Sequence, residues 1–178
     1  SRRTPAPSKS ACDTIPMAEW SGNPSKRTTP LPLPVDLVIF QHTVTKECLT
    51  DDECEDIVKR IQSYHINSLK WNDIGTSFLV GGNGKIYEGS AWNIGAHSLG
   101  YNNKSIGISF IGDFRSQSPT DVALQTVQSF LKCAVIQDYL ADDYKLIAHS
   151  QISNTESPGA YLRDLIRIWP HWVDNKKL

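Results

Sequence analysis

The chain has 178 residues, of which 21% are charged and 39% are hydrophobic, and its formal net charge is -1. This length predicts one domain with one buried core. The balanced charge excludes a nucleic-acid binder, because phosphate contacts need an excess of Lys and Arg. No apolar run approaches the roughly 20 residues that span a bilayer and no leader-like segment opens the chain, so we expect a mature or excised piece.

Residues 1–11 are rich in Pro, Ser and basic side chains without an apolar period, and they predict a flexible tether. We expect the ordered domain to occupy residues 12–178. Residues 35–40, VDLVIF, form a short apolar run after several prolines. This run predicts a buried strand that ends at His42.

The hydrophobic period then changes to three and four residues, with acidic side chains at its start, which predicts a helix over 52–67. The segments 76–82 and 85–89 flank Asn83-Gly84, and this pair predicts a β-hairpin. Residues 104–114 alternate in the manner of another strand.

Residues 118–140 predict a second long helix, with Ser118 as its N-cap and Pro119 as its first residue. Residues 143–149 predict a buried strand, and residues 157–169 predict a final helix. Helices alternate with short apolar strands along the chain. The sequence therefore predicts an α/β fold with a mixed central sheet and helices on its faces.

Four cysteines indicate the compartment. Cys48 and Cys54 enclose a short polar segment, whereas Cys12 and Cys133 are far apart. This spacing matches no common zinc motif, so disulfides in an oxidising, extracellular setting are favoured.

Two histidines, His42 and His149, each follow a predicted strand at its C-terminal end, where functional groups gather on an open sheet. They could share a zinc ion, but a hydrolytic zinc site needs a third ligand, which is usually anionic. The position suited to that ligand holds Ser157, whose neutral hydroxyl binds zinc poorly. The residues alone favour another interpretation of Ser157, as the N-cap of the last helix ahead of Pro158. A serine nucleophile paired with His149 is disfavoured, because no G-x-S-x-G motif is present.

Six ordered blocks resemble the peptidoglycan recognition proteins, which are relatives of zinc-dependent N-acetylmuramoyl-L-alanine amidases. They are VIFQHT, the C-x5-C pair, IQSYHINSLKWNDIG, FLVGGNGKIYEG, GAHSLGYNNKSIGISFIGDF, and TESPG with IWPHW, and they cover about Cys12 to Trp172. The resemblance is greater to the receptor-type members, and the C-terminal blocks look like the membrane-anchored LC subtype. It implies a mixed sheet with three helices and a groove over one face, and disulfides Cys48–Cys54 and Cys12–Cys133.

The same resemblance implies a zinc site that lacks one of its ligands. His42 and His149 match two zinc ligands of the amidases, but Ser157 replaces the cysteine ligand. Thr76 replaces the tyrosine that assists catalysis, while Thr155 retains its family type. The resemblance therefore implies no metal or other cofactor, and recognition of peptidoglycan without hydrolysis.

The groove that the resemblance implies combines aromatic, imidazole, amide and hydroxyl groups, which suit a muropeptide. Its predicted residues are His42, Trp71, Thr76, Trp92, His97, Asn102, Lys104, His149 and Thr155. For Trp71 and Trp92, filling of the core is the alternative. Lys104 occupies the place of an arginine that grips diaminopimelate, which favours that peptidoglycan type, although a solvated lysine remains the alternative.

Three departures from the family pattern concern the groove rim. Ala91 stands where the family pattern Y-E-G-x-G-W has a glycine before the tryptophan, and the segment from Trp92 to His97 is one residue shorter than usual. In addition, Asn103-Lys104-Ser105 is an N-glycosylation sequon. Two hypotheses follow. The domain is a receptor ectodomain, anchored to a membrane and dimerising with itself or a relative on signalling, that binds a muropeptide in its own groove. Alternatively, its groove is impaired, and it docks onto a ligand-loaded relative.

Overall fold

A computed structural model describes residues 11–174 of the chain. The tether predicted for residues 1–11 lies almost entirely outside this range, as do the last four residues of the predicted domain. The helices and strands, in chain order, are η1 (Ala11–Asp13), β1 (Val35–His42), α1 (Asp51–Ser63), η2 (Tyr64–Ser68), β2 (Phe78–Val80), β3 (Ile86–Glu88), β4 (Ile106–Phe110), α2 (Asp121–Ile136), β5 (Leu140–Ala148), η3 (His149–Gln151) and α3 (Ala160–Ile166).

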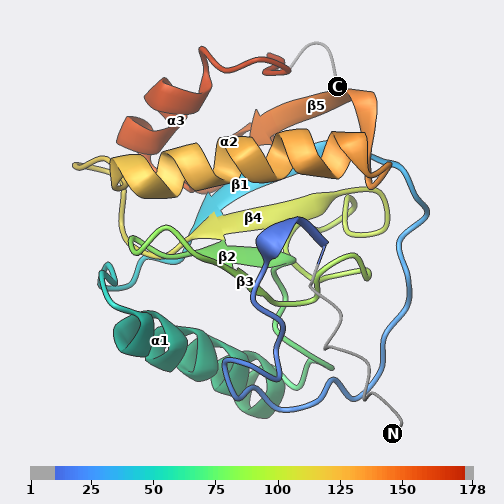
Figure 1. Ribbon diagram of the computed structural model, residues 1–178, viewed down its shortest axis with the longest axis vertical. Coiled ribbons are helices and arrows are strands. Elements are labelled where there is room, and N and C mark those ends of the chain that lie inside the picture. The colour runs from blue at the N-terminus through green and yellow to red at the C-terminus, as the bar shows by residue number, and fades with distance from the viewer. Residues whose placement is uncertain (1–10, 175–178) are drawn as a thin grey trace, which may run out of the picture.

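The five strands form one mixed sheet in the order β3-β2-β4-β1-β5. β1 runs parallel to β4 and β5, and β2 runs parallel to β4, while β3 closes an antiparallel hairpin with β2. Helix α1 covers one face of the sheet, and α2 and α3 cover the other (Figure 1). This arrangement confirms the predicted mixed sheet with three main helices.

Each face of the sheet has its own hydrophobic core. Phe40, Phe78 and Phe110 pack toward Phe130 of α2, whereas Leu79 packs with the residues of α1 and with the fully buried Trp20. Strands β1 and β4 are buried along almost their whole length, as expected for central parallel strands. Within residues 11–174, no helix has the length and apolar character that a membrane span requires.

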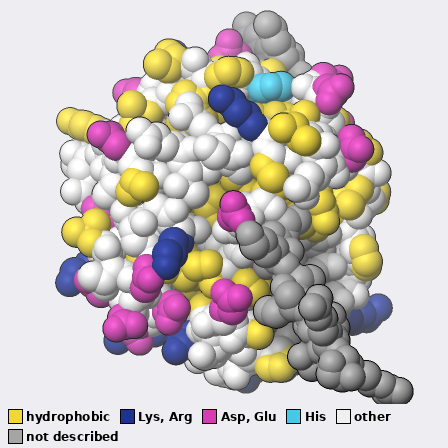
Figure 2. Space-filling model, viewed as in Figure 1, with side chains coloured by type: hydrophobic (Ala, Val, Ile, Leu, Met, Phe, Trp, Pro, Cys, Tyr) yellow, Lys and Arg dark blue, Asp and Glu magenta, His cyan; other side chains and the backbone are white. Residues whose placement is uncertain are grey.

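Both disulfides have the predicted pairing. Cys12 is joined to Cys133, which links the first described turn to α2 across 121 positions, and Cys48 is joined to Cys54 at the start of α1. Acidic and basic side chains are interspersed over α1 in Figure 2, without a field of one sign. This mixture agrees with the near-zero net charge.

Two predicted helix starts are wrong. Helix α2 is capped by Thr120, whose Oγ1 accepts a hydrogen bond from the Ala123 amide at 3.3 Å and donates one to the Gly82 carbonyl at 2.8 Å. Because this hydroxyl also ties the helix to the β2–β3 hairpin, it caps α2 in place of Ser118. Helix α3 begins after Gly159, so Ser157 is not its N-cap.

Candidate functional site

The C-terminal ends of β1 and β5 bring His42 and His149 to one cavity of about 650 Å³. The two strands are parallel neighbours with Phe40 opposite Ala148, so the residues that follow emerge at the same edge of the sheet. The cavity also contains Trp71, Thr76, His97, Thr155 and Ser157 from the predicted set. We call this space the groove cavity.

Three predicted groove residues lie outside the walls of the groove cavity. Trp92 packs on the α2 face of the sheet, with its ring centroid 5.4 Å from that of Phe78 and 4.8 Å from that of Tyr139. Asn102 accepts a hydrogen bond from the Ser98 amide at 2.8 Å, and the exposed Lys104 places its Nζ 4.8 Å from the centroid of the Tyr101 ring. Of the alternatives open for Trp92, the structure favours filling of the core.

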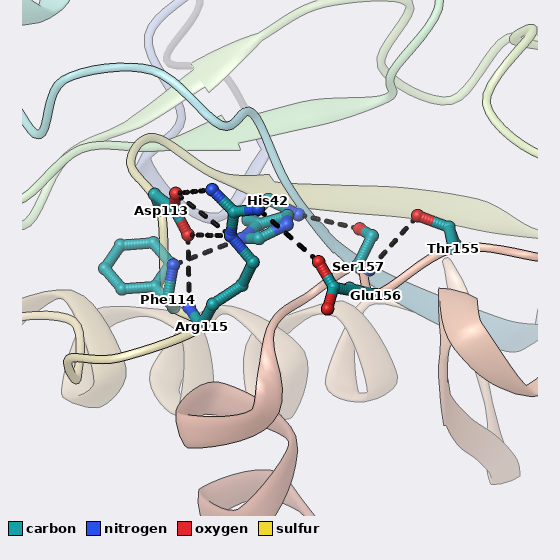
Figure 3. Close-up of polar contacts among 7 residues, drawn as sticks. All are labelled: His42, Asp113, Phe114, Arg115, Thr155, Glu156 and Ser157. Atoms are coloured by element: carbon teal, nitrogen blue, oxygen red, sulfur yellow. Dashed lines mark hydrogen bonds and ion pairs between the residues drawn. The ribbon is translucent and has the colours of Figure 1, made fainter.

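Ser157 is buried and belongs to the floor of the groove cavity. Its Oγ accepts a hydrogen bond from the backbone amide of His42 at 3.1 Å, and its own amide donates to Thr155 Oγ1 at 3.2 Å (Figure 3). The hydroxyl therefore ties the end of β1 to the loop before α3.

Replacing Ser157 by alanine should lower the free energy of unfolding by about 1–3 kcal/mol, because the buried His42 amide would lose its acceptor. Ser153→Ala is the matched control, since Ser153 is exposed four positions earlier in the same loop. Urea denaturation measures both changes. Equal stability of the two variants would contradict this role for Ser157.

His42 is held in one orientation by the segment after β4. Its Nδ1 accepts a hydrogen bond from the Phe114 amide at 3.2 Å (Figure 3). A backbone N–H can only donate, so Nδ1 has no proton and the neutral ring carries its proton on Nε2. Burial lowers the pKa of His42, which favours this neutral form. His42 thus offers the N–H of Nε2 as a donor, and the lone pair of its Nδ1 already accepts the hydrogen bond from the Phe114 amide.

These contacts do not fit the zinc ion that an amidase would hold. Ser157 brings no negative charge, and its oxygen is engaged with the His42 amide. A zinc ligand must offer an unprotonated ring nitrogen, but the lone pair of His42 Nδ1 faces the Phe114 amide. No group of three or more His, Cys, Asp and Glu side chains placed for a metal occurs between residues 11 and 174. Thr76 is buried, and its hydroxyl donates to the Gly107 carbonyl at 3.2 Å.

The loops beside His42 are joined by ion pairs among Asp113, Arg115 and Glu156. Arg115 binds the carboxylate of Asp113 through Nε and Nη2, and its Nη1 lies 3.4 Å from Glu156 Oε2 (Figure 3). Hydrogen bonds from Arg115 lower the pKa of Asp113 to about 2. These ion pairs connect the loop after β4 to the loop that carries Ser157.

His97 is the most strongly perturbed titratable group in the groove cavity. Its Nδ1 lies 3.0 Å from Ser98 Oγ, whereas its Nε2 is buried without a hydrogen-bond partner. Burial lowers the pKa of His97 to about 4. The imidazole is therefore neutral at physiological pH.

The His97 pKa makes stability depend on pH. The folded protein binds this proton only near pH 4, while the unfolded chain binds it near 6.5, so stability falls as pH drops through this window. Between pH 7 and 5 the wild type should lose about 2 kcal/mol more stability than His97→Gln. Urea denaturation at both pH values measures the difference, and identical losses would contradict the burial of a neutral His97.

The sequence prediction missed the wall that the end of α1 contributes. The sequence pattern placed His65 only in the apolar stripe of a helix. Its Nδ1 accepts a hydrogen bond from the Gly75 amide at 2.8 Å, and its ring centroid lies 4.8 Å from that of Trp71. Its neighbour Tyr64 also lines the groove cavity. Both lie in η2, a π-helical turn of the kind often found at functional sites. A histidine in an otherwise apolar stripe was the one sequence feature that pointed to this wall.

Comparison with known proteins identifies the family. Residues 31–160 match the model of the N-acetylmuramoyl-L-alanine amidase family Amidase_2. A peptidoglycan recognition protein of Bombyx mori is 48% identical over 92% of this chain and 84% of its own length. The chain belongs to the peptidoglycan recognition protein family. Peptidoglycan-recognition protein SA of Drosophila melanogaster is 44% identical over 92% of the chain and 82% of its own length.

Solved structures of the family share the fold. The peptidoglycan recognition protein LE, in complex with tracheal cytotoxin, superposes with a TM-score of 0.90 at 41% identity, over 93% of this chain and 98% of that one. The ectodomain complex of peptidoglycan recognition proteins LCa and LCx, bound to the same cytotoxin, gives a TM-score of 0.88 at 42% identity, over 90% of this chain and 98% of the matched one.

Proposed function

We propose that this peptidoglycan recognition protein domain, which we place at residues 12–178, binds muropeptides in the groove cavity and does not hydrolyse them. The groove cavity of about 650 Å³ carries the proposal, because its size and its mixture of rings with a few polar groups are typical of ligand sites. Relatives with the same fold were solved with tracheal cytotoxin, a monomeric diaminopimelic acid-type peptidoglycan.

The walls of the groove cavity suit a glycopeptide. The rings of Trp71 and His65 both line the groove cavity with their centroids 4.8 Å apart, and sugar and peptide groups can pack against them. His42 and His65 each accept a backbone hydrogen bond at Nδ1, so their neutral rings carry the proton on Nε2 as a donor for ligand carbonyls. Thr155 supplies a hydroxyl beside them.

The same residues give no support to hydrolysis. Activation of water by zinc requires three protein ligands, and Ser157 replaces the anionic one. Thr76 stands where the amidases have a tyrosine, and its hydroxyl is directed to a backbone carbonyl of β4. We therefore assign the domain to recognition.

Calorimetry with a monomeric diaminopimelate muropeptide tests the proposal. The wild type should bind, and Trp71→Ala should weaken binding about tenfold through the loss of ring contacts. Trp92→Phe is the control, because this ring lies on the other face of the sheet and its loss should leave the affinity unchanged. Failure of the wild type to bind, or an equal effect of the two variants, would refute direct recognition.

The second hypothesis, an interaction module that docks onto a ligand-loaded relative, is favoured by one observation. Trp92, Asn102 and Lys104 do not line the groove cavity, so part of the contact set implied by the family is displaced. Titration of the domain into a ligand-competent relative, with and without muropeptide, separates the hypotheses. Binding only to the loaded relative supports the module, and binding to muropeptide alone supports the receptor.

The setting of the receptor is part of the proposal. The two disulfides support an extracellular domain, which we place in a membrane-anchored receptor that dimerises on signalling. The charge of Lys104, on the exposed loop after His97, supports a preference for diaminopimelate. Asn103 is exposed next to it and is available to carry a glycan.

A further inference from the structure

A second cavity of about 450 Å³ lies beside the groove cavity, and no predicted binding residue other than Trp71 belongs to it. Trp71, Gly75 and Ala96 line both spaces. A side chain at Gly75 would meet the Trp71 ring at 2.5 Å, so this ring packs directly on the backbone. The indole is therefore the partition between the groove cavity and what we call the side cavity.

Backbone hydrogen bonds fix the walls of the side cavity. The Lys26 amide donates to the Asn72 carbonyl at 3.0 Å, and the Ile94 amide donates to the Thr29 carbonyl at 2.7 Å. These bonds fasten residues 25–29 to the loops that contain Asn72 and Ile94. The backbone of this surface is therefore pre-formed, and a ligand has to order only the exposed side chains on it.

The side cavity is lined by two positively charged side chains that have no ion-pair partner among the described residues. Arg27 and Lys70 line it, and among residues 11–174 neither makes an ion pair. The one carboxylate in the lining, Asp73, accepts hydrogen bonds from Gln62 Nε2 at 3.1 Å and from the Ile74 amide at 2.7 Å. Burial raises the pKa of Asp73. The hydroxyl group of Thr28 adds a neutral donor, whereas the Ser25 hydroxyl donates to the Arg27 carbonyl at 3.3 Å.

We propose that the side cavity binds a free carboxylate of a ligand whose main part occupies the groove cavity. Arginine and lysine side chains with hydroxyl neighbours form charge-assisted hydrogen bonds with carboxylates. This inference rests on the proposed function, and it adds a second contact site for the same ligand. In a muropeptide the sugars are uncharged and the stem peptides carry the free carboxylates. The first stem peptide belongs to the part of the ligand in the groove cavity, so the carboxylate in the side cavity comes from a second stem peptide.

The test compares a monomeric muropeptide with its peptide-cross-linked dimer by calorimetry. The wild type should bind the dimer about fivefold more tightly than the monomer, and Arg27→Gln or Lys70→Gln should remove this difference while leaving monomer affinity unchanged. Lys26→Gln is the matched control, since Lys26 is adjacent in sequence but does not line the side cavity. A dimer with amidated carboxyl groups should bind like the monomer.

The outcomes are distinct. Equal binding of monomer and dimer by the wild type, or an equal effect of Lys26→Gln and Arg27→Gln, would overturn this inference and leave the groove cavity assignment standing. A preference for the amidated dimer as strong as for the free acid would also overturn it. Failure of every muropeptide to bind would overturn the proposed function, and this inference with it.

Discussion

Replacing Cys12 and Cys133 together by serine is expected to lower the free energy of unfolding by about 5 kcal/mol. The disulfide closes a loop of 121 positions, and the loss of chain entropy in the unfolded state grows with the length of such a loop. It also fastens the first described turn to α2. This loss is a large part of the about 5–15 kcal/mol by which a folded domain is typically stable.

The second disulfide provides the internal comparison. Cys48 and Cys54 are only 6 positions apart, so the Cys48→Ser/Cys54→Ser variant should lose about 2 kcal/mol. Denaturant unfolding of both variants measures the difference. A larger loss from the short loop than from the long one would contradict the chain-entropy explanation.

Gly159→Ala is expected to lower the free energy of unfolding by about 4 kcal/mol. Gly159 has φ 93° and ψ 147°, a conformation that is essentially confined to glycine and costs other residues about 1–3 kcal/mol. A Cβ atom there would also lie 2.3 Å from the carbonyl carbon of Phe114, and backbone cannot move aside easily. The substitution should also disturb the neighbouring contact between Ser157 and His42.

Gly100→Ala separates the two causes of that loss. Gly100 also has a positive φ, of 85°, but a Cβ atom there would meet nothing within 4 Å. This variant should lose only about 1 kcal/mol, from the backbone conformation alone. Thermal or urea unfolding measures both variants, and equal losses would show that the contact with Phe114 is unimportant.

The elements of the fold were predictable from the sequence because their patterns are local. Residues 35–40 are apolar except for the exposed Asp36, as suits a buried central parallel strand, and the Asn83-Gly84 pair marks the hairpin. Helix starts were less predictable. Thr120 and Ser118 are both good N-caps, and the choice depends on the Gly82 carbonyl, which is far away in sequence.

The site was predictable where the sheet determines it. His42 ends β1 and His149 follows β5, and because these strands are parallel neighbours, the proximity of the two histidines follows from topology. Trp92 could not be placed in the same way, because its position depends on packing against Tyr139. The role of Ser157 depended on where α3 begins, and that in turn depends on the close approach of Gly159 to Phe114.

We propose that Ser157 and the orientation of His42 allow recognition of peptidoglycan but not its hydrolysis. The most direct test incubates the purified domain with zinc and a monomeric diaminopimelate muropeptide, beside a zinc-containing amidase of the family. Metal analysis should find far less than one zinc ion per chain after dialysis, and chromatography should recover the muropeptide intact. Stoichiometric zinc together with release of the stem peptide from the muramic lactyl group would contradict the account.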